Sequence, residues 1–160
     1  MGPDYLRAEH GTRAQQSLSN PIWRSFSEKI VTKMGERYGQ NPTVIGWQLD
    51  NEPEAKEDYS PSSQAAFRNW LKNKYQTIDA LNKAWGTAFW SQIYDDFSQL
   101  KIHNANHVGW WGTNPHALLD FKRYLADTQA DFLDFQAEIL RPLISKNQYI
   151  CLGRVEDNRE

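Results

Sequence analysis

The chain has 160 residues, a formal net charge of −2 and an aromatic content of 13%. Its 18 lysines and arginines offset 20 aspartates and glutamates without forming a dense basic run, which argues against binding to nucleic acid or another polyanion. A single cysteine, Cys151, excludes an internal disulfide and a cysteine-based zinc cluster made from this chain alone.

The N-terminal region of the sequence offers no membrane or export signal. No apolar run reaches the roughly 18 residues that predict a membrane span, and no charged and then apolar leader opens the chain. We therefore expect a cytoplasmic protein without a membrane partner. Export stays open, because a signal upstream of Met1 would not be visible in these residues.

The first half of the chain predicts a helix and then a strand. Behind Asn20 and Pro21, apolar residues recur at steps of three and four, which indicates an amphipathic helix that Gly35 or Gly39 can end: Trp23, Phe26, Ile30, Val31 and Met34. The following run, residues 41–49, has too few polar residues for a half-exposed strand. It predicts a strand buried on both faces in a parallel sheet.

Two shorter helices are predicted next. Ser60 and Pro61 form an N-cap and first-turn pair for a helix with one apolar face: Phe67, Trp70, Leu71 and Tyr75. A second helix occupies residues 77–86 and stops at Gly86. An irregular segment rich in aromatic residues follows it.

The last predicted helix is long. It opens at Asn114 and Pro115 and runs until Pro142 interrupts it, with apolar residues at heptad-like spacing: Leu118, Phe121, Leu125, Phe132, Phe135 and Ile139. The final run, residues 147–153, can start another buried strand. Helices that alternate with buried strands indicate an α/β protein.

Asp50, Asn51 and Glu52 follow directly after the predicted strand. In α/β proteins the catalytic groups lie beyond the carboxyl ends of the strands, because loops from several strands converge there. A functional interpretation makes Glu52 a general acid or base, with Asn51 orienting a substrate hydroxyl. The alternative is a plain turn, since Asp, Asn and Pro all favour turns, and the residues alone leave both interpretations open.

Three stretches in the same order resemble the β-galactosidases of glycoside hydrolase family 42: VIGWQLDNEP, FRNWLKNKYQTIDALNKAWGTAFWSQIYDDF and NPHALLDFKRYLAD. The resemblance extends from about His10 to Tyr149. It implies an incomplete TIM (β/α)8 barrel with roughly strands three to five and their helices. It also divides the chain into a partial catalytic domain, residues 1–150, and a divergent tail, residues 151–160.

By this resemblance the chain is a fragment of a retaining enzyme that hydrolyses terminal β-D-galactosides. Glu52 matches the family's acid/base glutamate at the end of the fourth strand, and Asn51 matches the residue that binds the sugar near its 2-hydroxyl. Arg13 matches an arginine that reaches the galactose, and Trp90 matches an aromatic residue of the sugar subsite. Asp50 is expected to support these groups by hydrogen bonding rather than to catalyse.

The same resemblance sets the expected partners. They are a β-galactoside or galacto-oligosaccharide, with no cofactor and no nucleic acid, and full-length members are expected to be homo-oligomeric. Many members hold a structural zinc with cysteines in the loop after the acid/base glutamate. The corresponding loop here, Pro53–Gln64, contains no cysteine, so no zinc is expected in it. The four histidines lack metal-ligand spacing and are expected at the surface: His10, His103, His107 and His116.

The family's nucleophile is a glutamate on the seventh strand, and we expect it to be absent from this chain. Two alternatives therefore stay open. One is a galactoside-binding remnant without catalytic activity. The other is a helical interaction module built on the Leu118–Ile139 stripe, although so short a stripe, followed by Pro142, barely supports a coiled coil. Trp85 and Phe89 are expected in the core.

Overall fold

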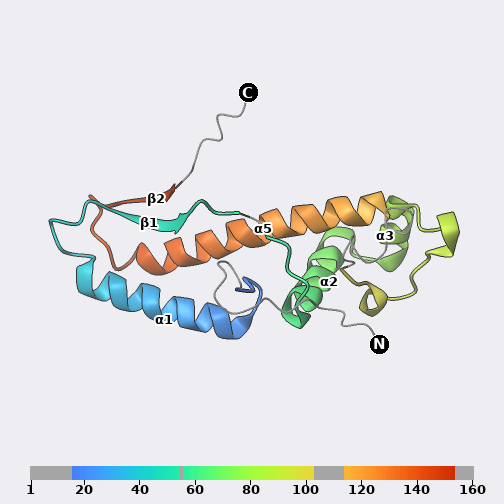
Figure 1. The fold of residues 1–160 in the computed structure, drawn as a ribbon, viewed down its shortest axis with the longest axis horizontal. Helices are drawn as coiled ribbons and strands as arrows, with labels where there is room; N and C mark the ends of the chain where they lie inside the picture. Colours follow the sequence, from blue (N-terminus) through green and yellow to red (C-terminus); the bar gives the residue numbers. More distant parts are fainter. Residues whose placement is uncertain (1–15, 55, 103–113, 154–160) are drawn as a thin grey trace, which may run out of the picture. The chain divides into compact units, whose positions relative to one another are not determined.

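The computed structural model describes residues 16–54, 56–102 and 114–153 (Figure 1). These residues fall into two compact units. The first unit holds residues 16–19, 56–102 and 114–126, and the second holds residues 20–54 and 127–153. Each unit has its own hydrophobic core.

The helices of the first unit begin and end where the sequence predicts. Helix α2 spans Pro61–Tyr75, and the Ser60 side chain caps it by accepting a hydrogen bond from the backbone N–H of Ser63. Helix α3 spans Ile78–Trp85. Gly86 follows it in the left-handed conformation, with φ 63°, which glycine adopts without a steric cost.

The core of the first unit forms between these helices, residues 115–126 of α5 and the segment around two 3-10 turns, η1 (Phe89–Ser91) and η2 (Phe97–Gln99). Its buried members are Phe67, Leu71, Leu81, Trp85, Leu100, Ile102, Phe121, Tyr124 and Leu125. Leu71 and Leu81 are fully buried, and each such side chain contributes about 1.5–3 kcal/mol.

The expected core position of Phe89 is wrong, whereas that of Trp85 is confirmed. Phe89 is 71% exposed, because it begins a single 3-10 turn at the surface. Thr87 is buried instead, and its hydroxyl donates to Oδ1 of Asn82 at 2.7 Å. The sequence pattern could not separate these positions, since a turn has no apolar periodicity.

The second unit contains helix α1 (Pro21–Tyr38) and two parallel strands, β1 (Gly46–Asn51) and β2 (Tyr149–Gly153) (Figure 1). The Asn20 side chain caps α1 as predicted. A small core comprises Trp47, Leu140 and Ile144, with Val31, Val44, Leu49 and Ile150 packed against it. The indole of Trp47 donates to Oε1 of Gln148 at 2.8 Å, which fixes β1 to the turn before β2.

The prediction that the first strand is buried on both faces is wrong for this chain. Trp47 is buried, but its neighbour Gln48 is exposed, and Ile45 just before the strand is 69% exposed. The reason is that the sheet has two strands in the described part of the chain, so few side chains are available to cover its faces.

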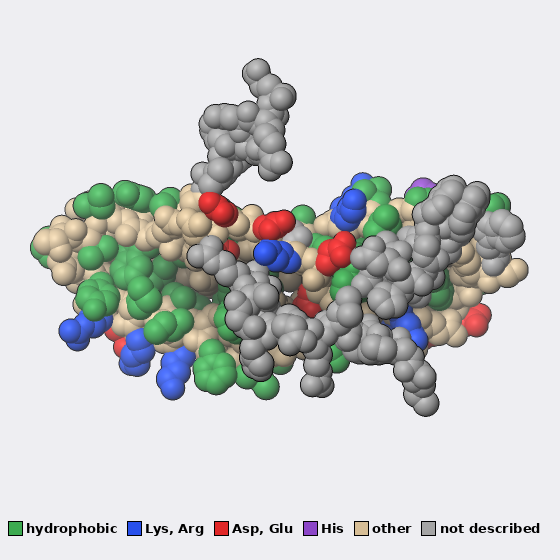
Figure 2. All heavy atoms as spheres, viewed as in Figure 1, with side chains coloured by type: hydrophobic (Ala, Val, Ile, Leu, Met, Phe, Trp, Pro, Cys, Tyr) green, Lys and Arg blue, Asp and Glu red, His purple; other side chains and the backbone are tan. Residues whose placement is uncertain are grey.

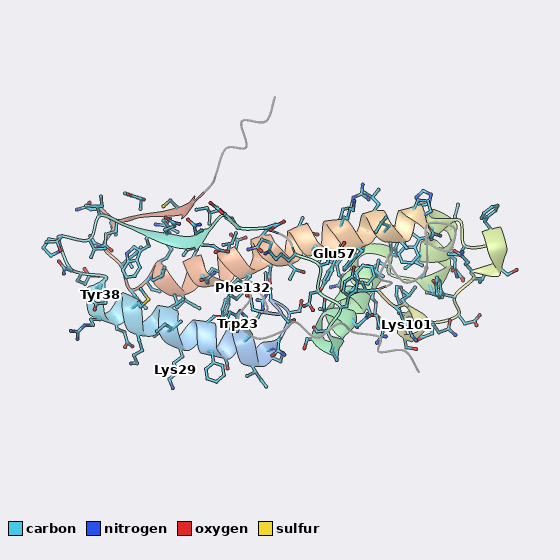
Figure 3. All side chains as sticks on the ribbon, viewed as in Figure 1. Trp23, Lys29, Tyr38, Glu57, Lys101 and Phe132 are labelled. Atoms are coloured by element: carbon cyan, nitrogen blue, oxygen red, sulfur yellow. The ribbon has the colours of Figure 1, made fainter. Side chains whose placement is uncertain are left out.

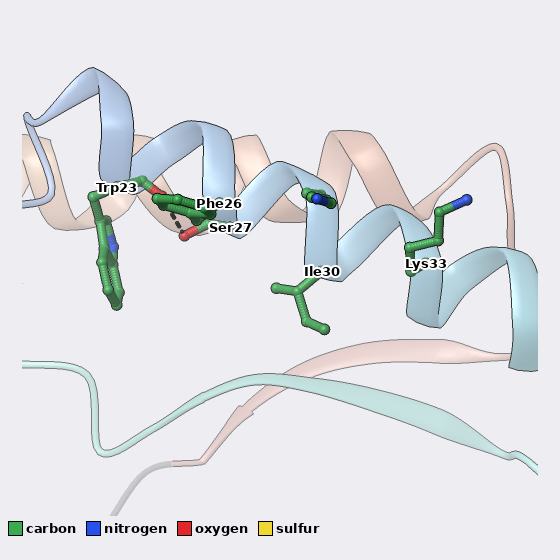
Figure 4. A pocket seen from close by; sticks show the side chains of 6 residues that line it. Trp23, Phe26, Ser27, Ile30 and Lys33 are labelled. Carbon is green, nitrogen blue, oxygen red and sulfur yellow. Dashed lines mark hydrogen bonds between the residues drawn. The ribbon is translucent and has the colours of Figure 1, made fainter.

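Helix α1 forms as predicted, yet much of its apolar surface faces solvent. Phe26 and Ile30 are 63% and 58% exposed, while Val31 packs against the core. Figure 2 shows hydrophobic side chains, lysines and arginines along α1, and Figure 3 labels Trp23 and Lys29 on it. A groove of about 480 Å³ lies on this helix, lined by Trp23, Phe26, Ser27, Lys29, Ile30 and Lys33 (Figure 4).

Helix α5 spans Pro115–Leu140 and thus ends just before Pro142, as predicted. The Asn114 side chain accepts hydrogen bonds from the first backbone N–H groups of the helix. Phe121 and Leu125 are buried in the first unit, and Phe132 is buried in the second, where the guanidinium of Arg24 lies over its ring at 5.7 Å. Much of the apolar stripe is therefore buried against other residues of this chain. This burial removes the main support for a helical interaction module.

Among the described residues, no helix combines the length and the apolar character needed to cross a membrane.

Candidate functional site

Glu52 follows directly after Asn51, the last residue of the parallel strand β1, which is where the sequence predicts a catalytic group. Its backbone N–H donates to the carbonyl of Gly153 at 2.8 Å. Gly153 is the last residue of β2, so the ends of the two strands hold Glu52 in place. Strand β2 continues through Cys151–Gly153, residues that the resemblance assigned to a divergent tail.

A bulge precedes Glu52. Gln48 pairs with Cys151 and Asn51 pairs with Gly153, so β1 contains one residue more than β2 over this interval. An extra residue twists a strand locally and redirects the side chains that follow, and such bulges are frequent beside active sites. No sequence pattern predicts this bulge, because strand register depends on the partner strand.

The backbone of Glu52 has a positive φ of 54°. A residue with a Cβ atom rarely adopts this conformation, which costs on the order of 1–3 kcal/mol and persists only where the surroundings enforce it. Here the hydrogen bond to Gly153 supplies such a constraint. Strain of this kind clusters at functional sites, which supports a functional interpretation of Glu52 over a plain turn.

Two neighbours hold Asn51. Oδ1 of Asp50 accepts a hydrogen bond from the Asn51 backbone N–H at 2.8 Å. The carboxamide of Gln48 donates from Nε2 to the Asp50 carbonyl at 3.1 Å and to Oδ1 of Asn51 at 3.3 Å. The Asp50 carboxylate thus acts on the backbone of Asn51, in line with the supporting role expected for it.

Gly153 leaves the space that this arrangement needs. A Cβ atom at Gly153 would lie 2.4 Å from Nε2 of Gln48 and 3.2 Å from Oδ1 of Asn51. Any larger residue would therefore displace the Gln48 carboxamide. Sequence reasoning missed both Gln48 and Gly153, although a glutamine within an otherwise apolar strand is a signal that could have pointed to the first.

The Glu52 carboxylate is exposed and has no hydrogen-bond donor among the described residues. Asn51 and Glu52 are both exposed, and no side chain or backbone group in residues 16–54, 56–102 and 114–153 donates a hydrogen bond to that carboxylate. The acidic residues Glu57 and Asp58, in contrast, accept hydrogen bonds from the Tyr59 hydroxyl and the Ser60 backbone N–H. Glu52 thus differs from Glu57 and Asp58 in that its carboxylate accepts no hydrogen bond from the described residues.

The described structure does not place the other predicted site residues relative to this strand end. Arg13 lies outside the described residues, as do His10, His103 and His107. The backbone of Trp90 lies in η1 of the first unit, and its side chain is likewise outside the description. His116 is exposed, and within the described ranges no group of His, Cys, Asp and Glu side chains could hold a metal ion.

The sequence is similar to known proteins over nearly its whole length. The family model of glycoside hydrolase family 42, described as beta-galactosidase, matches residues 2–151. The chain is 42% identical over 142 residues to beta-galactosidase BglY of Alicyclobacillus acidocaldarius, covering 88% of this chain and 20% of that protein. It is also 42% identical over 138 residues to a beta-galactosidase of Thermus thermophilus, covering 84% of this chain and 21% of that one.

Solved structures give the same result. The polyextremophilic beta-galactosidase from Halorubrum lacusprofundi superposes with a TM-score of 0.84 at 32% identity, over 92% of this chain and 22% of that one. The beta-galactosidase from the psychrophilic Marinomonas ef1 superposes with a TM-score of 0.82 at 36% identity, over 89% of this chain and 22% of that one. The chain therefore spans about a fifth of the length of the proteins it matches.

Proposed function

Because this chain belongs to the β-galactosidases of glycoside hydrolase family 42, we propose that it is a segment of a retaining glycosidase that hydrolyses terminal β-D-galactosides. In this proposal β1 and β2 are the fourth and fifth strands of a (β/α)8 barrel. The substrate is a β-galactoside or galacto-oligosaccharide. The observation that carries the proposal is an exposed glutamate held directly after a parallel strand beside an asparagine, whose carboxylate accepts no hydrogen bond from the described residues.

Glu52 is the proposed acid/base residue. In the first step its carboxylic acid protonates the glycosidic oxygen, so that the glycosidic C–O bond breaks and the aglycone leaves as an alcohol, while a second carboxylate attacks the anomeric carbon and forms a covalent glycosyl-enzyme. In the second step its carboxylate takes a proton from the water that hydrolyses this intermediate. The constraint on the Glu52 backbone favours this role, since an acid/base group must keep one position through both steps.

Asn51 is the proposed ligand of the sugar near its 2-hydroxyl, a contact that strengthens in the oxocarbenium-like transition state. Its location next to Glu52, with its backbone fixed by Asp50, supports this assignment. Arg13 and Trp90 complete the proposed galactose subsite on the strength of the family resemblance alone.

The test is a graft in which residues 2–153, the matched residues 2–151 extended to the end of β2, replace the corresponding segment of the Thermus thermophilus beta-galactosidase. Glu52→Gln should lower kcat/KM on lactose by roughly 10²–10⁴-fold, because the leaving oxygen would depart unprotonated. Formation of the glycosyl-enzyme from an aryl galactoside with a good leaving group should suffer far less, since that oxygen needs little protonation.

Asp50→Asn is the matched control, because an asparagine at this position can still accept the hydrogen bond from the Asn51 backbone. It should retain most of the activity. An equal loss on lactose and on the aryl galactoside in Glu52→Gln would count against the acid role. A graft that folds, as judged by its thermal unfolding, but whose activity is indifferent to Glu52→Gln would reject the proposed function.

A further inference from the structure

The carboxamide of Gln48 has no assigned role, yet it contacts the side chain of the proposed sugar ligand. We propose that Gln48 is a positioning residue that fixes the orientation of the Asn51 amide, so that its Nδ2 group faces the galactoside. This inference rests on the proposed function of the site. Gln48 itself touches no substrate in this arrangement and acts through Asn51.

The orientation of both amides follows from one unambiguous acceptor. The nitrogen and oxygen of an amide are hard to distinguish, so their assignment must come from the hydrogen bonds they make. The backbone carbonyl of Asp50 can only accept, and it lies 3.1 Å from the Gln48 amide, so the Gln48 atom facing it must be the nitrogen. That same nitrogen lies 3.3 Å from Asn51, whose facing atom must then be the oxygen.

The Asn51 amide is thereby left with a free donor. With Oδ1 turned toward Gln48, the Nδ2 group of Asn51 has no acceptor among residues 16–54, 56–102 and 114–153, and the residue is exposed. A sugar hydroxyl is a suitable acceptor for such a donor. A carboxamide rotated by half a turn would offer an acceptor instead, so Gln48 selects which of the two groups the ligand meets.

The strand geometry keeps Gln48 in reach of Asn51. The bulge between these residues brings a side chain from within β1 to the end of the strand, and Gly153 provides the space for it. Since a Cβ atom at Gly153 would lie 2.4 Å from Nε2 of Gln48, the contact between Gln48 and Asn51 requires a glycine at this position of β2.

Two isosteric variants in the graft test this role kinetically. Gln48→Met keeps the length of the side chain but removes the donor, and kcat/KM should fall about tenfold, the value of one hydrogen bond. Gln48→Glu places an acceptor where the Gln48 nitrogen now donates to Oδ1 of Asn51, so it should turn the Asn51 amide over and cost clearly more than Gln48→Met. Gln40→Met is the control, since it removes a similar hydrogen bond to the Leu143 carbonyl in the same unit.

A double-mutant cycle separates positioning from general loss of structure. In an Asn51→Ala background, Gln48→Met should change kcat/KM by less than about twofold, because no amide is left to orient. If the tenfold loss persists without Asn51, Gln48 acts on the strand and not on Asn51, and the proposal is overturned.

The side-chain amide resonances of the 160-residue chain provide a readout that needs no activity. Gln48→Met and Gly153→Ala should both shift the ¹H–¹⁵N resonances of the Asn51 carboxamide, and Gln40→Met should not. Unchanged Asn51 resonances in Gln48→Met would overturn the proposal even if the graft is active. Activity that depends on Glu52 but shows no coupling between Gln48 and Asn51 would reject this inference alone, whereas activity independent of Glu52 rejects the proposed function.

Discussion

At the scale of single residues, the backbone of Glu52 is the feature that ties the structure to the chemistry. Its φ of 54° is unfavourable for a residue with a Cβ atom, and only its neighbours keep it there. Glycine or asparagine would fit this conformation at a lower cost.

Replacing Glu52 should therefore separate stability from activity. We expect Glu52→Gly to unfold at a higher urea concentration than Glu52→Ala, with about 1 kcal/mol more stability, because glycine adopts positive φ freely. Both variants should abolish the activity of the graft toward lactose. Urea unfolding of the 160-residue chain at low micromolar concentration measures the difference. A Glu52→Gly variant that is less stable than Glu52→Ala would show that the strain is absent.

Single residues also show which local features the sequence predicts well. The caps at Asn20, Ser60 and Asn114 and the left-handed Gly86 are all where the sequence places them, because each depends on the chemistry of one residue and its near neighbours. The contact between Gln48 and Asn51 was not predictable. It depends on a bulge that exists only because β1 pairs with β2.

At the scale of elements, one buried carboxylate joins the helices of the first unit. Asp120 on α5 is 2% exposed and accepts hydrogen bonds from the Tyr75 hydroxyl at 2.6 Å and the Trp85 indole at 2.9 Å. Lys74 and Arg123 form ion pairs with it. Burial alone would raise the pKa of Asp120, but the hydrogen bonds from Lys74, Tyr75 and Trp85 outweigh burial and hold that pKa below its usual range.

The pKa of Tyr75, whose hydroxyl donates to Asp120, shifts in the opposite direction. Burial, together with its hydrogen bond to Asp120, raises the pKa of Tyr75 to about 12, so Tyr75 stays a neutral donor at every pH near neutrality. The network thus joins a charged aspartate to the cationic side chains of Lys74 and Arg123 and to the uncharged aromatic donors of Tyr75 and Trp85. Substituting the aspartate leaves those donors without their acceptor, which is the costly case for a buried polar group.

The Asp120 network predicts how the stability of the chain depends on pH. A carboxyl with a lowered pKa in the folded state stabilises the fold above its unfolded pKa of about 4, and this contribution is lost as pH falls through the lower folded value. We expect urea unfolding to show stability falling below about pH 4. Asp120→Asn should lower the free energy of unfolding by about 3 kcal/mol at pH 7. It should also flatten the acid limb, which is the fall in stability below about pH 4.

Asp134→Asn is the control for this experiment, because Asp134 is an exposed aspartate on the same helix. It should leave both the stability at pH 7 and the acid limb nearly unchanged. An acid limb of equal slope in wild type and Asp120→Asn would show that Asp120 is not responsible for it.

Elements were predicted far better than their environments. Every helix and strand expected in the described residues is present, because hydrophobic periodicity and caps are local properties. The burial of those elements was less accurate. An apolar run such as residues 41–49 predicts two covered faces, yet covering them requires strands and helices that the described residues do not provide.

At the scale of the whole molecule, the exposed apolar surface and the greater length of the relatives both indicate that further structure covers this segment in its relatives. Phe26 and Ile30 on α1 and Ile45 before β1 are mostly exposed, and the sheet has two strands in the described part of the chain. Such surfaces and open strand edges favour association with other chains. The chain matches about 20% of the length of BglY, so its relatives contain much more structure than this segment supplies.

The last prediction follows from the chemistry that a retaining glycosidase requires. Such an enzyme needs two carboxyl groups about 5–5.5 Å apart, one as acid/base and one as nucleophile on the opposite face of the sugar. Glu52 can provide the first. Asp50, Glu54, Glu57 and Asp58 are close to it in sequence, and residues that follow one strand end are poorly placed to approach the sugar from its opposite face.

We therefore expect the purified 160-residue chain to show no turnover of an aryl β-galactoside, and the graft into the Thermus thermophilus enzyme to restore it. The restored activity should depend on Glu52, which Glu52→Gln in the graft tests. An isolated chain could also be inactive because it is misfolded. The Asn51 amide resonances distinguish this case from the absence of a nucleophile, because they report whether the strand end is formed. Robust turnover by the isolated chain that disappears in Glu52→Gln would mean that a nucleophile lies within these 160 residues, and the assignment of the second carboxylate to another part of the barrel would then be wrong.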